Sequence, residues 1–119
     1  MNTIENTTLT SEQLSRINDN IRKNLCLLNC NVRVDGVYGQ LVFTRNAIDI
    51  LGENLAVLLV AIAKFDEFNE GNDPHGEHDF GKIELFGETW FWKFDYYDRK
   101  LQYFGHEVHV LTVMNANDY

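Results

Sequence analysis

Residues 72–81, N-D-P-H-G-E-H-D-F-G, place two histidines and three carboxylates around the only proline of the chain. A histidine held by a carboxylate can exchange a proton near neutral pH. Imidazole and carboxylate groups are also the ligands that zinc, manganese and iron accept in proteins. The motif therefore could support acid–base chemistry or metal binding, and its candidate catalytic residues are Glu77, His78 and Asp79.

The histidines of the chain fall into two H-x2-H pairs. That spacing puts both imidazoles on one side only where the backbone is helical, and the first pair instead spans a turn. Pro74 fits the second position of this turn and Gly76 the fourth. A metal site stays open as a hypothesis, and no cofactor is predicted. The candidate ligands of this metal site are His75, His78, Asp79, His106 and His109.

Two strands joined by a tight turn must position this motif. Lys82–Phe86 and Thr89–Asp95 flank Gly87-Glu88, and a two-residue loop with glycine first predicts a type II′ hairpin. In that register Phe86 faces Thr89. Side chains alternate between the faces of a strand, so five apolar residues should share one side. These are Ile83, Leu85, Trp90, Trp92 and Phe94.

Extending the same register places Asp79 opposite Tyr96, His78 opposite Tyr97 and Glu77 opposite Asp98. The resulting corner has three interpretations: a hydrogen-bonded closure of the sheet, an acid–base site, or a metal site completed by Asp95 or Asp98. A bulge at Gly81 would shift the pairing. The candidate binding residues of the corner and its turn are Asp73, Glu77, Asp79, Asp95, Tyr96, Tyr97 and Asp98.

The remaining elements follow from periodicity. Apolar residues at helical spacing from Leu14 to Leu28, after a capping-box sequence at Thr10-Ser11, predict a first amphipathic helix. Residues 40–44 predict a strand and 45–51 a helical turn. Residues 53–65 are apolar on nearly every side, which predicts a helix buried against a sheet, and 106–117 predict a short helix, although that stretch also contains strand formers. We expect a flexible N-terminus at 1–9 and a single α+β domain at 10–119, with a small antiparallel sheet packed against two or three helices.

The formal charge of −8 argues against direct nucleic-acid binding, which depends on lysine and arginine displacing counterions from phosphates. It suits a basic protein partner. The longest apolar run, Leu55–Ala63, has nine residues, too few to cross a bilayer, and the N-terminus lacks a signal-peptide pattern. These features predict a cytoplasmic protein without membrane contact. Cys26 and Cys30 are expected on a helix as buried free thiols.

The motifs N-D-P-H-G-E-H-D-F-G, F-W-K-F-D-Y-Y-D and V-L-T-V-M resemble a small bacterial domain of unknown function found in proteobacterial genomes and mobile elements. The resemblance implies no activity, but it suits an accessory protein of a phage or plasmid. We therefore expect a non-catalytic acidic protein-binding module, such as an anti-CRISPR-like inhibitor that occupies a basic nucleic-acid-binding surface of a host defence protein. The alternative is a small metal- or His/Asp-dependent enzyme that uses the corner.

Overall fold

The computed structural model describes residues 9–119, so the expected flexible N-terminus lies almost entirely outside the described residues. Helix α1 (Ser11–Asn24) starts with the predicted capping box. The Thr10 hydroxyl accepts from the Gln13 amide at 3.1 Å, and the Gln13 side chain accepts from the Thr10 amide at 2.9 Å. These bonds satisfy two amide groups that the first turn leaves without partners.

Helix α1 ends earlier than the apolar spacing predicts. Leu25 is the C-cap and is buried, but Leu28 is 99% exposed. A tight turn follows, in which Cys26 and Asn29 exchange backbone hydrogen bonds of 3.0–3.1 Å. Cys26 is exposed and Cys30 half-buried, so the prediction of buried helical thiols is wrong. The chain leaves the helix one turn too soon for either thiol to reach the core.

The five strands form one sheet in the order β1-β2-β5-β4-β3. Neighbouring strands are antiparallel except β2 and β5, which are parallel. The α+β class is therefore confirmed, but the sheet is mixed instead of purely antiparallel. The strands are β1 (Asn31–Val34), β2 (Val37–Phe43), β3 (Phe80–Leu85), β4 (Glu88–Tyr97) and β5 (Val108–Asn115).

Strand β5 replaces the predicted C-terminal helix. It pairs with β2 on one side and β4 on the other, so it lies at the centre of the sheet. Val108 and Met114 are buried on one face, and Leu111 and Val113 on the other. A strand buried on both faces loses the alternation of apolar and polar residues, and its apolar positions can then imitate helical spacing.

The β3–β4 hairpin forms with a different turn from the one predicted. Leu85 pairs with Glu88, and the loop is Phe86-Gly87 with φ of 57° and 72°, as in a type I′ turn. The register is two residues from the expected one, so the five apolar side chains still share the inner face. The position of Gly81 explains why this register forms. It pairs with Trp92, whose ring occupies the space that a Cβ at position 81 would fill.

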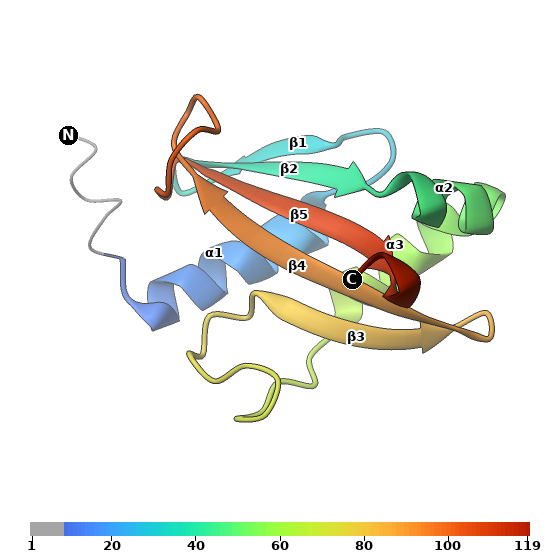
Figure 1. Ribbon diagram of the computed structural model, residues 1–119. Helices are drawn as coiled ribbons and strands as arrows, with labels where there is room; N and C mark the ends of the chain where they lie inside the picture. Colours follow the sequence, from blue (N-terminus) through green and yellow to red (C-terminus); the bar gives the residue numbers. More distant parts are fainter. Residues whose placement is uncertain (1–8) are drawn as a thin grey trace.

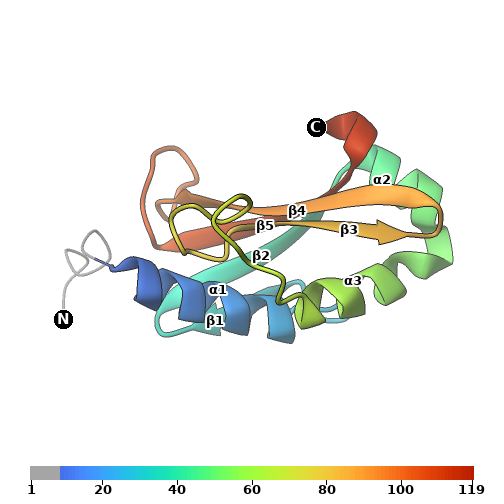
Figure 2. The ribbon, with the colours of Figure 1, turned by 90° about the horizontal axis from the view of Figure 1, so that it is seen from below.

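The helices cover one face of the sheet. Figure 2 shows α1 and α3 (Leu55–Lys64) beneath it, with the C-terminal end of α3 lying beside α1. Helix α2 (Arg45–Leu51) and the 3-10 turn η2 (Gly52–Asn54) lead from β2 into α3 at one end of the molecule (Figure 1). The core between the layers contains residues of both helices and the sheet, including Ile21, Leu58, Trp92 and Leu111.

The helical segment Arg45–Lys64 has a mean hydropathy of 1.7 and could cross a membrane by length and composition alone. Within this fold it is interrupted at Gly52, whose φ is 52°, and it packs Leu58 and Ile62 into the core. Helix α3 is therefore packed against the sheet, as predicted, but only on one side. Val57 and Val60 are 48% and 53% exposed, which leaves one side of α3 without a partner among residues 9–119.

Candidate functional site

The motif at residues 72–81 lies in the loop between α3 and β3. Asp73 organises it: one carboxylate oxygen accepts from the amides of Glu77 and His78 at 3.1 Å, and its carbonyl accepts from the Gly76 amide at 3.1 Å. Since Pro74 follows Asp73, the predicted proline turn is confirmed. Asp73 is 8% exposed, so the carboxylate of this predicted binding residue makes its hydrogen bonds within the loop.

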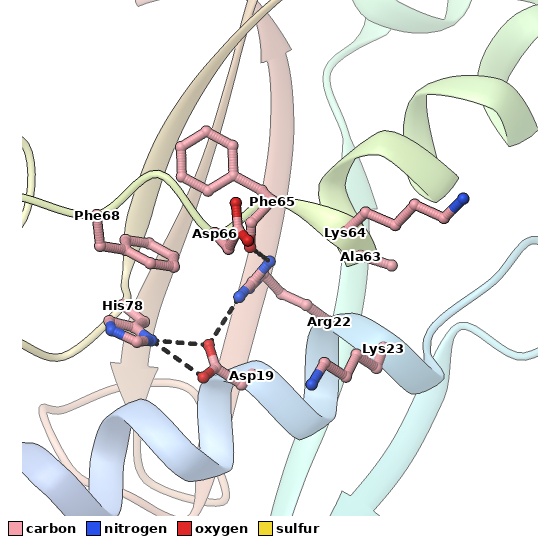
Figure 3. Close-up of a pocket in the computed structure, with 9 residues that line it drawn as sticks. All are labelled: Asp19, Arg22, Lys23, Ala63, Lys64, Phe65, Asp66, Phe68 and His78. Atoms are coloured by element: carbon pink, nitrogen blue, oxygen red, sulfur yellow. Dashed lines mark hydrogen bonds and ion pairs between the residues drawn. The ribbon is translucent and has the colours of Figure 1, made fainter.

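His78 does not meet the D-Y-Y-D segment. Because β3 and β4 pair in the shifted register, the Asp79 carbonyl accepts from the Phe94 amide, and His78 takes a positive φ of 55° that turns it toward α1. Its Nδ1 lies 2.9 and 3.0 Å from the two carboxylate oxygens of Asp19 (Figure 3). Its Nε2 faces Asp73 at 3.7 Å. The predicted pairing with Tyr97 is wrong.

Phe68 and Arg22 complete this arrangement. The His78 ring stacks on Phe68 with centroids 3.8 Å apart and planes inclined by 3°. Arg22 donates to the same Asp19 oxygen as His78, at 2.7 Å. We call Asp19, Arg22, Phe68, Asp73 and His78 the loop clamp, because together they join the loop to α1.

Arg22 is 3% exposed, which requires strong compensation for a charged group. It donates to the carbonyls of Ile62 and Phe65 at 2.6 and 3.1 Å at the C-terminal end of α3, where the Ile62 carbonyl also accepts from the Phe65 amide at 3.2 Å. Its guanidinium carbon also lies 4.7 Å from the centroid of the Trp92 ring. Arg22 therefore caps one helix from the side of another.

A second network lies deeper, at the end of the sheet. Tyr96 donates to a Glu77 carboxylate oxygen at 2.9 Å, and Asn18 donates to the Tyr96 hydroxyl and the Glu77 carbonyl at 3.0 Å. The Asn18 oxygen lies 2.8 Å from His109 Nδ1, and His109 Nε2 lies 3.0 Å from His106 Nδ1. We call Asn18, Glu77, Tyr96, His106 and His109 the buried chain.

The donors of the buried chain determine its tautomers. Because Asn18 uses its amide nitrogen for two donations, its oxygen must accept, and His109 must carry its proton on Nδ1. His109 Nε2 then accepts from His106 Nδ1. Every hydrogen bond therefore runs in one direction, toward the Glu77 carboxylate, and His109 is neutral. None of the three predicted pairs of the corner forms, and Glu77, which was expected opposite Asp98, contacts Tyr96 instead.

Burial dominates the electrostatics of these groups. It lowers the pKa of His109 to about 3, with a smaller contribution from His106, and it lowers the pKa of His106 as well. Burial raises the pKa of Tyr96, and hydrogen bonding and charge from Glu77 act in the same direction. The pKa of Asp79 is raised, first by burial and then by the charge of Glu77.

The four-histidine hypothesis is wrong in this geometry. His75 is exposed in the proline turn, His78 faces Asp19, and His106 and His109 belong to the buried chain. Residues 9–119 contain no group of three or more histidine, cysteine or carboxylate side chains arranged to hold a metal ion.

The other predicted binding residues lie apart. Asp95 and Tyr97 are half-exposed on the sheet face opposite α1 and α3, where Asp95 pairs with Lys93 at 3.1 Å. Asp98 accepts from the amides of Lys100 and Gln102, and hydrogen bonding, first from Gln102, lowers its pKa. A metal site made from His78 and Asp79 with Asp95 or Asp98 is therefore not assembled.

Sequence reasoning missed the α1 residues that hold both networks. Asn18 and Arg22 are 0% and 3% exposed, and they follow Leu14 at successive four-residue steps. Polar residues inside the apolar stripe of a helix signal buried hydrogen bonding. That signal was available, although it does not identify the partners.

A cleft of about 660 Å³ adjoins the loop clamp, with Lys23 and Lys64 at its rim and Phe65 and Phe68 in its wall (Figure 3). Asp66 also lines this cleft, and Glu67 and Glu70 follow it in the loop. Asp66, Glu67 and Glu70 are exposed, and within the described chain their side chains make no hydrogen bond or ion pair. We call these three residues the acidic rim.

The comparisons with known proteins identify the family but no activity. No curated protein and no solved structure matches the chain. A family described as "Protein of unknown function (DUF3768)" matches residues 43–118. The match includes the loop, the hairpin and β5, whereas Asn18, Asp19 and Arg22 precede it. Because it covers more than half of the sequence, the chain belongs to this family of proteins of unknown function.

Proposed function

We propose that the protein is a non-catalytic binding module of the cytoplasm whose acidic rim engages a basic surface of a protein partner. The observation that carries this proposal is that the loop at residues 65–79 has two kinds of polar side chain, one bonded within the domain and one exposed to solvent. The side chains of Asn72, Asp73 and His78 make hydrogen bonds within the domain, while Asp66, Glu67 and Glu70 face solvent.

Fixing the loop beforehand favours binding. A loop of this length without regular structure is uncommon in a compact domain and is usually functional. Here Asn69 and Asn72 tie its first half together, with bonds of 2.8–3.1 Å to backbone groups, and the loop clamp ties its second half to α1. A preformed loop loses little conformational entropy when a partner binds, so more of the charge attraction contributes to affinity.

The partner class that we propose is a protein whose basic surface normally holds nucleic acid, as in an anti-CRISPR-like inhibitor of a host defence system. The formal charge of −8 supports this choice, since it opposes direct contact with phosphates and favours a lysine- or arginine-rich surface. The enzyme alternative was based on a corner in which Glu77, His78 and Asp79 meet the D-Y-Y-D segment, and the position of His78 beside Asp19 gives it less support than the binding module.

The test is a pull-down from host lysate at low and moderate salt. The acidic-rim variant Asp66→Asn/Glu67→Gln/Glu70→Gln should lose at least about tenfold in affinity for the recovered basic partner, because each exposed charge contributes a few tenths to one kcal/mol. The matched control Glu12→Gln/Asp35→Asn/Asp49→Asn removes the same charge elsewhere on the exposed surface. Equal binding by both variants, or no basic partner at any salt concentration, would contradict the proposal.

A further inference from the structure

The side of α3 that faces away from the sheet carries three exposed residues in one stripe, and a fourth exposed residue, Glu53, lies just before the helix in η2. Glu53, Val57, Val60 and Lys64 are spaced by four, three and four residues. At 3.6 residues per turn the three α3 residues, Val57, Val60 and Lys64, lie within about 60° of one another around the helix axis. The spacing matches the seam by which two helices pack side by side. We call these four residues the α3 stripe.

The apolar surface extends beyond the stripe. The turn after α1 brings Leu27 and Leu28, which are 45% and 99% exposed, beside α3. Between this turn and the helix lies a groove of about 530 Å³ whose wall includes Ala56 and Ala63. Small side chains let a second helix approach closely, and a contiguous apolar groove on a charged protein marks an interaction surface.

The charges at the ends of the stripe identify the occupant. Glu53 lies at the N-terminal end and Lys64 at the C-terminal end, and in the described chain neither has an ion-pair partner. Two copies of this stripe laid antiparallel place each glutamate against the lysine of the other copy and each valine pair against its counterpart. A parallel arrangement would oppose like charges at both ends. The stripe is thus complementary to itself in one orientation only.

We propose that two copies of the protein associate through the α3 stripe, about a twofold axis that runs the helices antiparallel. Such an interface is isologous, because the same patch is used by both subunits. It adds apolar contact between the valines and Leu28 on a surface whose net charge elsewhere is repulsive for a second copy. The interface lies on the helix side of the molecule, and at its Lys64 end it borders Asp66 and Glu67 of the acidic rim.

The charge pairs provide the decisive test. In sedimentation equilibrium or light scattering over a concentration series, wild type should shift toward the mass of two chains. Glu53→Lys and Lys64→Glu should each weaken the dimer about tenfold, because symmetry converts two attractive pairs into two repulsive ones. The double variant Glu53→Lys/Lys64→Glu restores both pairs in reversed polarity and should recover the wild-type dissociation constant at low salt.

Matched controls separate this interface from the monomer fold and from the acidic rim. Val60→Asp should abolish the dimer, whereas Leu101→Asp, at a residue 46% exposed in the loop after β4, should not. Glu70→Lys repeats the charge change of Glu53→Lys on the acidic rim and should leave the dimer intact. Each charge variant opposes the dipole of α3, so circular dichroism must show equal folding before the dissociation constants are compared.

The outcomes are distinct. A wild-type monomer at every concentration overturns the proposal. A double variant as weak as the single variants also overturns it, because the stripe would then bind something other than its own copy. Binding of the monomer to lipid vesicles, lost in Val60→Asp and unaffected by charge reversal, would assign the same surface to a membrane instead. Loss of partner capture in the acidic-rim variant with an intact dimer supports both proposals, since the two associations then respond to different charges.

Discussion

The loop clamp and the buried chain start from neighbouring residues of α1, but the first holds a surface loop and the second connects buried polar groups. Asp19 and Arg22 hold a surface loop and the end of α3 with charged groups, and Asp19 and His78 retain 28% and 29% side-chain exposure. Asn18 instead begins a chain of neutral donors that reaches two buried histidines. Charge is tolerated where water or a helix end can compensate it, and neutral hydrogen bonding replaces it in the interior.

The comparison also separates what each network can do. The loop clamp positions the acidic rim, so changes there should alter binding more than folding, apart from Arg22. The buried chain joins α1 to β4 and β5 and ends at Glu77, so changes there should alter stability and its pH dependence. The following changes test this distinction, from the largest expected effect to the smallest.

Arg22→Met should cost about 3 kcal/mol of unfolding free energy. It keeps most of the apolar stem but removes the side-chain donor to the carbonyls of Ile62 and Phe65 and leaves Asp19 without its cation. Urea denaturation followed by circular dichroism measures the loss. The control Lys23→Met removes an exposed cation from the next position and should change stability by less than about 0.5 kcal/mol. Equal effects would show that Arg22 does not cap α3.

His109 should make the protein sensitive to mild acid. Its pKa is about 3 in the folded state against an ordinary value of 6.5, so the unfolded chain binds more protons between these values. Stability from the neutral form is present above pH 6.5 and is lost as pH falls, by about 1.4 kcal/mol per pH unit. His109→Asn, which can still donate to Asn18, should reduce the slope of unfolding free energy against pH between about 6 and 4. An unchanged slope would contradict a neutral His109 in the buried chain.

His78→Ala should cost only about 1 kcal/mol, because its contact with Asp19 is partly solvated. The larger effect should be local: limited proteolysis should cut the loop at residues 65–79 faster while the sheet remains folded. His75→Ala, at an exposed position of the same turn, is the control and should leave the cleavage rate unchanged. Complete unfolding of His78→Ala would show that the loop clamp is part of the core and not a loop anchor.

Some features were predictable because their causes lie within a few residues. The capping box at Thr10 and Gln13 and the proline turn at Asp73–Gly76 depend on local backbone geometry. The inner face of the hairpin was also correct, although its turn was not. Type I′ geometry requires a positive φ at Phe86, which an aromatic side chain disfavours, so the local preference pointed to Gly87-Glu88.

The candidate site was predictable only in part. The motif identified the right loop, and Glu77 does contact Tyr96. The partners of His78 and His109 could not be inferred, because Asp19 and Asn18 lie 59 and 91 residues away in the sequence. Strand β5 was mistaken for a helix for a related reason: its pairing with β2 and β4 determines its burial, and no local pattern records that pairing.

The sequence alone determined the α+β class, the start of α1, the proline turn and the residues that share the inner face of the hairpin. These depend on dihedral preferences and on side-chain alternation, which act over a few residues. Tertiary structure decided the hairpin register, the central position of β5, and the assignment of His78 to Asp19 and His109 to Asn18. Those choices depend on which surfaces meet after the chain collapses, as when the Trp92 ring fits only over Gly81, and distant side chains then find the hydrogen-bond partners that burial requires.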